Sequence, residues 1–286
     1  MHEAGGLLHA VRQVWTMTTY GPSAVRVSVR ARKEGAILGH DDRLVFVVGS
    51  PRSGTSFTAR TLGEQPGFVD LGEVKPLKAA LPGLVALPAD EQATALRRIL
   101  DRFRRLAFVQ HLRGVEQTPE TSFVVAAALE AYPGSAALHV LRDGRDVVCS
   151  LLERGWLSAG RDGRDDAGVA YGAYARFWVE PERREEFEAA SDARRAAWAW
   201  RRYVTSARQA PADRLVELRY EDLVSAPADA AARVGAGLHL DPGLLAGAFE
   251  AAHANSVGRW RDELTSEQLA DVEAEAGDLL AELGYA

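Results

Sequence analysis

The chain has 286 residues, of which 47% are hydrophobic and 26% charged, as is ordinary for a soluble globular protein with one α/β domain. Its formal net charge of −6 argues against wholesale nucleic-acid binding, which needs a basic surface, but leaves room for a local cationic pocket. Cys149 is the single cysteine, which excludes a disulfide framework and is typical of a reducing compartment.

Residues 1–42 mix acidic, basic and apolar side chains and lack the pattern of a cleavable signal. The apolar run LPGLVALP at 81–88 is far too short to span a bilayer. We therefore expect a cytoplasmic protein without stable membrane insertion, and we assign residues 1–42 no role.

Residues 43–286 are expected to form one domain in which strands and helices alternate. The apolar, β-branched run RLVFVV at 43–48 suits a buried strand of a parallel sheet. Further strands are expected within 64–73, 137–143 and 213–223, and helices at 53–62, 75–87, 89–108, 121–134, 145–156, 185–208, 241–253 and 265–285. This alternation predicts an α/β fold with a central parallel sheet flanked by helices.

The stretch GSPRSGTS at 49–56 has the glycine spacing of a phosphate-binding loop between a strand and a helix. Its backbone N–H groups and the helix dipole favour an anion, so the fold is expected to be of the P-loop nucleotide-binding type. Thr55 stands where a nucleoside triphosphatase carries lysine, which argues against a triphosphate, and Arg52 offers a planar fork suited to an oxyanion. The alternative is a glycine-rich turn without a ligand.

The sequence PRSGTS resembles the 5′-phosphosulfate loop of sulfotransferases that use 3′-phosphoadenosine 5′-phosphosulfate (PAPS). The form with arginine resembles the tyrosylprotein sulfotransferases and many bacterial members. The resemblance implies that the cofactor-binding residues of this loop are Arg52, Ser53, Gly54, Thr55, Ser56 and Phe57. Phe57 matches an aromatic residue that stacks on adenine, although packing in the core is at least as compatible with its position.

A second motif, VLRDGRDVVCS at 140–150, resembles the 3′-phosphate site of the same family. It places Arg142 at a strand end and Ser150 two turns into the following helix. A guanidinium and a hydroxyl can hold the 3′-phosphate that distinguishes PAPS from ordinary adenylates. For Asp143 and Asp146 we favour a structural ion-pair cluster, and the role of Arg145 stays open.

Two further segments resemble the family near the nucleotide. RYEDL at 219–223 supplies Tyr220, for which half-buried packing is an equal alternative. NSVGRWR at 255–261 resembles the segment that folds over the cofactor and supplies Ser256, Arg259 and Arg261 as further candidates. The resemblance covers about residues 43–286, whereas residues 1–42 and 157–187 match nothing in the family pattern.

Glu73, within DLGEVKP, is the candidate general base, because the tyrosylprotein-type branch has a glutamate at this position. The alternative is a structural glutamate at a helix start beside Lys75. Pro119 stands where cytosolic members carry a catalytic histidine, and His111 and Glu116 are the fallback bases.

Gln117 occupies the position of a family lysine that stabilises the leaving group, so it is a catalytic position that lacks its charge. Arg52 is therefore expected to carry more of the stabilisation and to be catalytic as well as cofactor-binding. Lys75 or Lys78 moving toward the reacting atoms is one alternative, and slow turnover is another.

The acceptor is expected to bind at an insertion over about 156–187. Aromatic residues there could line an apolar pocket or pack the insertion onto the core: Trp156, Tyr171, Tyr174, Phe177 and Trp178. Three arginines leave an anionic acceptor possible: Arg161, Arg164 and Arg176. The absence of a secretion signal favours a small-molecule hydroxyl, such as that of a natural product, glycolipid or sugar.

The resemblance thus implies a PAPS-dependent sulfotransferase that works without a metal. Two alternatives stay open at this point: a P-loop small-molecule kinase and a non-catalytic PAPS-binding protein. The seven histidines show no metal-ligand spacing with Cys149, and the oligomeric state is left undetermined.

Overall fold

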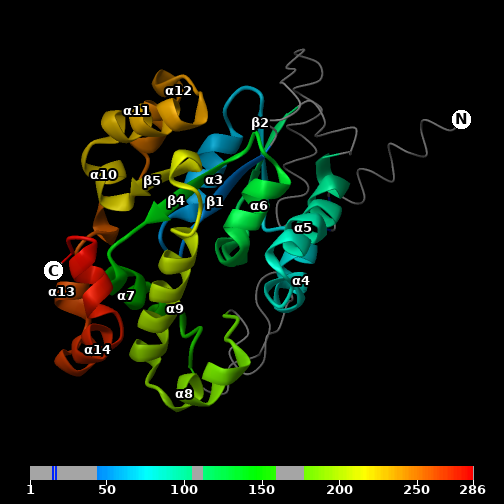
Figure 1. Ribbon diagram of the computed structural model, residues 1–286. Helices are drawn as coiled ribbons and strands as arrows, with labels where there is room; N and C mark the ends of the chain where they lie inside the picture. Colours follow the sequence, from blue (N-terminus) through cyan, green and yellow to red (C-terminus); the bar gives the residue numbers. More distant parts are fainter. Residues whose placement is uncertain (1–14, 16, 18–43, 105–111, 159–176, 286) are drawn as a thin grey trace, which may run out of the picture.

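The computed structural model describes residues 15, 17, 44–104, 112–158 and 177–285. Five strands form one parallel sheet in the order β2-β3-β1-β4-β5 (Figure 1). Their bounds are Leu44–Val48 (β1), Phe68–Gly72 (β2), Arg113–Glu116 (β3), Ala136–Leu141 (β4) and Leu215–Arg219 (β5). The predicted α/β fold with a central parallel sheet of the P-loop type is confirmed.

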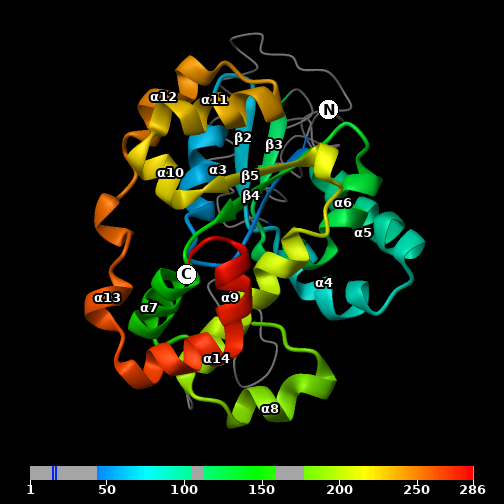
Figure 2. The same ribbon diagram turned by 60° about the vertical axis from the view of Figure 1, so that its left-hand side comes forward.

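Helices cover both faces of this sheet, as Figures 1 and 2 show. One face carries α4 (Lys75–Val85), α5 (Ala89–Arg104) and α6 (Val125–Ala131). The other carries α3 (Thr55–Gly63), α11 (Pro227–Leu238) and α12 (Pro242–Phe249). A third group packs together around α9 (Asp192–Ala207) and comprises α7 (Gly144–Arg154) and α14 (Ser266–Glu282).

The remaining short elements connect these layers. They are η1 (Pro119–Val124), η2 (Pro181–Arg183), α8 (Arg184–Ala189), η3 (Ala212–Arg214), α10 (Tyr220–Ser225), η4 (Ala254–Ser256) and α13 (Trp260–Glu263). In Figure 2, α13 lies beside α7, close to the carboxyl-terminal helix α14.

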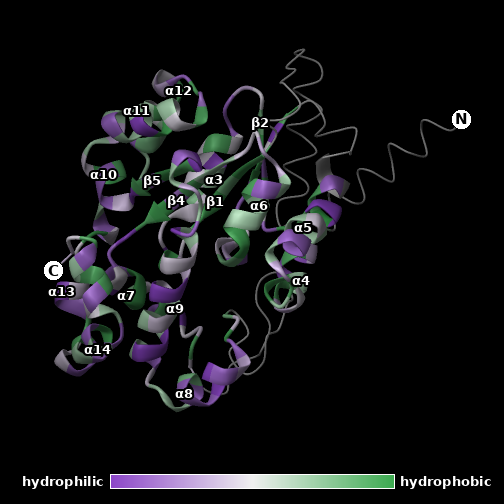
Figure 3. Ribbon diagram, viewed as in Figure 1, coloured by the Kyte–Doolittle hydropathy of each residue, from purple (hydrophilic) through white to green (hydrophobic). Residues whose placement is uncertain are grey.

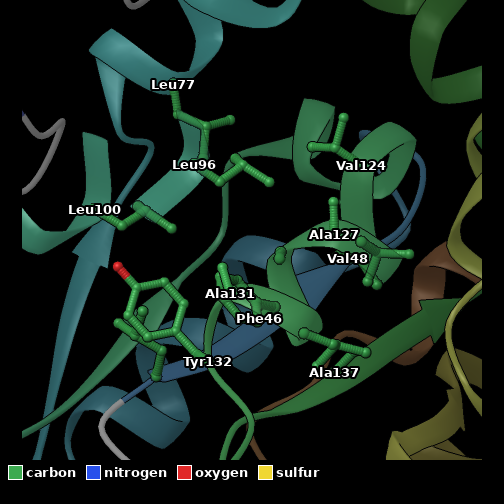
Figure 4. Packing of buried hydrophobic residues seen from close by; sticks show 14 of the residues in the cluster. Phe46, Val48, Leu77, Leu96, Leu100, Val124, Ala127, Ala131, Tyr132 and Ala137 are labelled. Atoms are coloured by element: carbon green, nitrogen blue, oxygen red, sulfur yellow. The ribbon is translucent and has the colours of Figure 1, made fainter. Parts of the chain in front are cut away.

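The strand β1 shows why the sheet is buried on both sides. Phe46 and Val48 point into the cluster under α4–α6, whereas Val45 and Val47 belong to the cluster under α3, α11 and α12. Figure 4 shows the first cluster, in which the Phe46 and Tyr132 rings lie 6.3 Å apart between centroids. Because both faces need apolar side chains, the strand is a continuous apolar run, and Figure 3 shows it accordingly coloured as hydrophobic.

The sequence gives no expectation of a strand at 113–116, yet β3 lies between β2 and β1. Its residues RGVE lack the apolar run of a buried strand, because polar partners replace apolar packing there. Arg113 donates to the Leu238 carbonyl at 2.5 Å and lies over the Phe68 ring, and the buried carboxylate of Glu116 accepts from Thr121 Oγ1 at 2.8 Å.

Two expected helices also differ from the structure. The single helix expected at 185–208 is divided into α8 and α9, because Ser191 adopts extended backbone and caps α9 by accepting from the Arg194 N–H. The helix expected at 121–134 starts as the 3₁₀ turn η1 and continues as α6. Ser53 lies before α3, which begins at Thr55 after the left-handed Gly54.

Candidate functional site

Each of the five strands is followed by a candidate site residue at the same edge of the sheet. Since the strands are parallel, their carboxyl ends share one edge, where ligands of open α/β sheets bind. The residues that follow β1 to β5 include, in strand order, Arg52, Glu73, Gln117, Arg142 and Tyr220. The topology therefore gathers candidates that lie as far apart in the sequence as Arg52 and Tyr220.

The loop between β1 and α3 has the backbone of an anion cradle. Gly49 and Gly54 have φ angles of 141° and 98°, and Arg52 adopts the left-handed region with φ 73°. A Cβ on Gly54 would lie 2.6 Å from the Tyr220 ring, so the loop packs directly against that ring. The Gly49 N–H donates to Ser122 Oγ at 3.1 Å, which fixes the loop to η1.

Two buried polar atoms at this loop have no hydrogen-bond partner in the part of the chain that the structure describes. They are the hydroxyl oxygen of Ser53 and Nε of Arg142, whose residues are 0% and 5% exposed. A buried donor without a partner is costly, so such atoms call for a ligand or water. A cation and a hydroxyl in a phosphate-type loop suit an oxyanion.

Arg142 joins the loop to the segment after α12. Its guanidinium donates to the Arg52 carbonyl at 3.0 Å and to the Ser256 carbonyl, and lies 5.2 Å from the centroid of the Tyr220 ring. The indole N–H of Trp200 donates to the Arg142 carbonyl at 3.0 Å. Arg142 is therefore held from several sides at the end of β4.

Arg52 points across the loop toward α7. Its Nε donates to Ser150 Oγ at 2.9 Å, and its guanidinium lies 5.6 Å from the Trp156 ring centroid. The structure thus brings together Arg52, Arg142 and Ser150, which the two sequence motifs predict as phosphate ligands. Phe57 is half-buried on α3 and packs against the cluster under α3, α11 and α12.

The segment 253–260, here called the strap, lies against α7 through its backbone. Asp146 accepts from the N–H groups of Gly258 and Trp260 at 2.7 and 3.1 Å, and Tyr220 donates its hydroxyl to the His253 carbonyl at 3.3 Å. Burial raises the pKa of the Asp146 carboxyl, while the two strap N–H groups lower it. Asp146 thus has a structural place, held by backbone N–H groups of the strap rather than by the expected ion-pair cluster.

The other charges around the strap have protein partners. Asp143 caps α7 through the Arg145 N–H at 2.9 Å and pairs with the Arg145 guanidinium at 2.8 Å. Arg145 also lies over the Trp260 ring, 3.9 Å from its centroid, which gives it a structural place. Arg259 pairs with Glu153 and Glu263, and Arg261 lies over the Trp260 ring. These contacts do not point either arginine toward the phosphate loop.

Glu73 is held at the start of α4 by a buried lysine. Lys78 Nζ lies 3.0 Å from Glu73 Oε2 and 3.6 Å from Glu120 Oε1. The Gln117 backbone N–H donates to the Gly72 carbonyl at 3.3 Å, beside Glu73. Glu73 and Gln117 are therefore neighbours through the pairing of β2 and β3.

The fallback base Glu116 is fully buried and engaged. It accepts from the Thr118 N–H at 2.7 Å and from Thr121 Oγ1 at 2.8 Å. Burial raises the pKa of this carboxyl to about 7, despite the hydrogen bonds that lower it. These contacts give Glu116 a structural place under the site, and His111 lies outside the described residues.

Three polar residues in η1 or just before it lie at the site without having been predicted from the sequence. Thr118 Oγ1 accepts from the Val74 N–H at 2.8 Å, Ser122 holds the phosphate loop, and Glu120 pairs with Lys78. The available signal was the run TPETS directly after a buried strand, since buried polar residues there need partners.

The family model described as "Sulfotransferase family" matches residues 45–242, which is more than half of the chain. The chain belongs to the sulfotransferase family. It is therefore a transferase enzyme, and the expected family is confirmed at this level. The comparison with curated proteins found no match.

A solved sulfotransferase structure shares this fold, and two others match with lower scores. A sulfotransferase domain from the curacin biosynthetic pathway matches with a TM-score of 0.54 at 12% identity, over 84% of this chain and 98% of that one. Sulfotransferase STF9 from Mycobacterium avium has a TM-score of 0.47 at 13% identity, covering 90% of this chain and 83% of its own. Mouse sulfotransferase SULT7A1 complexed with PAP has a TM-score of 0.45 at 13% identity, covering 93% and 90%. At 12% identity the likeness to the curacin-pathway domain shows the fold alone.

In this sulfotransferase, an aromatic group lies between η1 and α9, and it includes Trp178 of the segment expected to bind the acceptor. Phe123 lies 4.7 Å from Tyr203 and 5.8 Å from Trp178 between ring centroids. Phe177 is 1% exposed and packs against Tyr203, so its side chain belongs to the core. Several acceptor-side candidates lie outside the described residues: Tyr171, Tyr174, Arg161, Arg164 and Arg176.

Among the described residues of the sulfotransferase, no cluster of histidine, cysteine, aspartate or glutamate could hold a metal ion. No helix within the same residues is long and apolar enough to cross a bilayer.

Proposed function

We propose that this sulfotransferase moves the sulfuryl group of PAPS to a hydroxyl of a small-molecule acceptor. The proposal rests on two buried atoms at a glycine cradle, Ser53 Oγ and Arg142 Nε, which have no hydrogen-bond partner among the described residues. These donors fit the two anionic ends of PAPS. Ser53 with the loop N–H groups would hold the 5′-phosphosulfate, and Arg142 with Ser150 would hold the 3′-phosphate.

The remaining predicted contacts fit this donor with different strength. Tyr220 packs on the loop and Ser256 accepts from Arg142, so both belong to the proposed nucleotide site. Gly54, Thr55 and Ser56 are proposed contacts because they belong to the loop that would hold the 5′-phosphosulfate. Phe57, Arg259 and Arg261 stay predictions, because their contacts in the structure are equally structural.

When bound, PAPS supplies a sulfuryl group whose S–O bond to the 5′-phosphate breaks, with its electron pair leaving on adenosine 3′,5′-bisphosphate (PAP), as a new O–S bond forms. Glu73 takes the proton of the acceptor hydroxyl as general base. Arg52 offers positive charge at the loop, and Gln117 can donate a hydrogen bond but no charge. No metal takes part in the proposed scheme.

The acceptor is proposed to lie beside the aromatic group of Phe123, Trp178 and Tyr203, next to η1. Aromatic walls with few polar groups suit a small apolar or aromatic alcohol. The similar structure is a sulfotransferase domain from a biosynthetic pathway, that of curacin, which is compatible with this class. A cytoplasmic location is part of the proposal and rests on the single, buried Cys149.

Thermal unfolding with three nucleotides tests the donor. At a concentration about 100 times its dissociation constant, a ligand stabilises the folded state by roughly 2.7 kcal/mol. We expect stabilisation by PAP, with less from AMP and none specific to ATP with Mg²⁺. Stabilisation by ATP with Mg²⁺ alone would contradict the proposal and favour the kinase, against which the absent loop lysine already argues.

A turnover assay distinguishes the enzyme from a non-catalytic PAPS-binding protein. That alternative is suggested by Gln117, which lacks the charge of the family lysine. PAP release from PAPS is measured with a panel of phenols and alcohols. Glu73→Gln should lower kcat by about 10²- to 10⁴-fold while PAP still binds. PAP binding without turnover of any acceptor would support the binding protein instead.

A further inference from the structure

Lys78 is a buried lysine placed between two carboxylates on different elements. Its side chain is 6% exposed, and its Nζ lies 3.0 Å from Glu73 Oε2 and 3.6 Å from Glu120 Oε1. The Glu120 side chain is 0% exposed, whereas that of Glu73 is 26% exposed. Lysines are seldom buried unless they are paired with an acid, so the two carboxylates account for the burial of Lys78.

The partner Glu120 belongs to η1, which also holds the phosphate loop. Two residues after Glu120, Ser122 Oγ accepts the Gly49 N–H at 3.1 Å. Just before η1, Thr118 Oγ1 accepts the N–H of Val74, the residue next to Glu73, at 2.8 Å. Tyr203 on α9 further lies 3.5 Å from Glu120 Oε1. The segment η1 thus fixes the loop and the backbone beside Glu73 to one another.

We propose that Lys78 is a positioning residue of sulfuryl transfer, which holds the Glu73 carboxylate at a set place relative to the phosphate loop. The connection runs from Glu73 through the Lys78 ammonium to Glu120, and along η1 to the loop. A glutamate side chain has several rotatable bonds, and an ion pair to a buried cation restricts them. This inference rests on the proposed function, because it takes Glu73 as the base.

Lys78 also places a positive charge near the carboxyl edge of the sheet, where the proposed reaction occurs and where Gln117 carries no charge. The competing explanation is purely structural: Lys78 could serve only to neutralise the buried Glu120. That explanation predicts that removing both charges together restores the enzyme completely, since a buried charge is costly mainly when its partner is missing.

The test compares Lys78→Met with the double variant Lys78→Met/Glu120→Gln. The single variant leaves Glu120 buried without its cation, so its melting temperature should fall. The double variant should melt close to the wild type and bind PAP with the wild-type dissociation constant. Its kcat should nevertheless stay lower by on the order of 100-fold, because a base displaced by about 1 Å loses that much. Lys78→Arg should recover part of the loss.

PAP release from PAPS is followed with 2-naphthol and with water alone as acceptors, and PAP binding by calorimetry. A wild-type kcat in the double variant would overturn the inference, as would a loss in Lys75→Met that Lys78→Met does not share. A wild-type protein that fails to bind PAP, or binds it without turnover, would instead count against the proposed function. The two failures are therefore distinguishable, since the first requires an active wild type.

Discussion

Arg142 shows how one side chain can serve both the protein and its proposed ligand. Two of its guanidinium nitrogens donate to the Arg52 and Ser256 carbonyls, while Nε is buried without a partner among the described residues. The first two bonds orient the guanidinium, and the third donor is left to an anion. An arginine held in this way needs little further ordering when a phosphate binds.

Replacing Arg142 by alanine should weaken PAP binding by about 1.5–3 kcal/mol, because a charge-assisted hydrogen bond to the 3′-phosphate is lost. That corresponds to roughly 10- to 150-fold in the dissociation constant. Calorimetric titration measures it, and AMP is the matched control, since it lacks the 3′-phosphate and should lose much less. An equal loss for AMP and PAP would show that Arg142 supports only the loop.

Glu116 makes stability depend on pH below neutrality. Burial raises its pKa from 4.5 to about 7, so between these values the folded state keeps a proton that the unfolded chain has released. The stabilisation is fully present below pH 4.5 and is lost as pH rises toward 7, with a slope of at most about 1.4 kcal/mol per pH unit.

Glu116→Gln should remove this contribution, because an amide fits the same contacts to Thr118 and Thr121 without titrating. Urea unfolding of both proteins between pH 4.5 and 7 measures the difference. The wild type should lose stability relative to the variant as pH rises across this window. Parallel profiles would mean that the carboxyl ionises normally in the folded protein.

At the scale of elements, the backbone of the strap is bound to α7 through the Asp146 carboxylate, and Arg259 adds an ion pair to Glu153 of the same helix. Asp146 accepts from the backbone N–H groups of Gly258 and Trp260, whereas Arg142 and Tyr220 donate to the carbonyls of Ser256 and His253. The two residues that hold these carbonyls are also proposed to bind the nucleotide. We therefore expect nucleotide binding at the proposed site to depend on how firmly the strap is held, and we call this dependence the coupling.

Asp146→Asn should loosen the strap, because the amide presents an NH₂ group to one of the two backbone N–H donors. Leaving one buried donor unsatisfied costs about 1–3 kcal/mol, so PAP should dissociate roughly 10-fold faster or more. Stopped-flow displacement of PAP measures the rate. Asp143→Asn is the matched control, since asparagine still caps α7 and should leave the rate unchanged. Equal rates in wild type and Asp146→Asn would contradict the coupling.

At the scale of the whole molecule, the site exists because five parallel strands end at one edge. The order β2-β3-β1-β4-β5 places β1 at the centre, with β3 and β4 on its two sides. The loop after β1 is therefore flanked by Gln117 and Arg142, and Glu73 and Tyr220 follow from the outer strands. Helices on both faces bury the sheet (Figure 2), and ligands of open α/β sheets bind at the carboxyl ends of the strands.

Local sequence patterns were sufficient to predict the elements that depend mainly on neighbouring residues. The apolar run before GSPRSGTS predicts β1 and its loop, since both depend on neighbouring residues and on glycine conformations. The motif ending in Ser150 likewise predicts β4 and α7. Together these two motifs were sufficient to indicate the family.

Only the tertiary structure decided the parts that depend on distant partners. The strand β3 has no apolar run of its own, and it is stabilised by contacts to Leu238, Phe68 and Thr121 that no local pattern reveals. The same holds for Lys78, which reads as an ordinary helix lysine until Glu120, 42 residues later in the printed sequence, is brought beside it by η1. Charge pairing and burial are set by packing across the sheet, so the sequence could predict the loop after β1 but not the buried network behind Glu73.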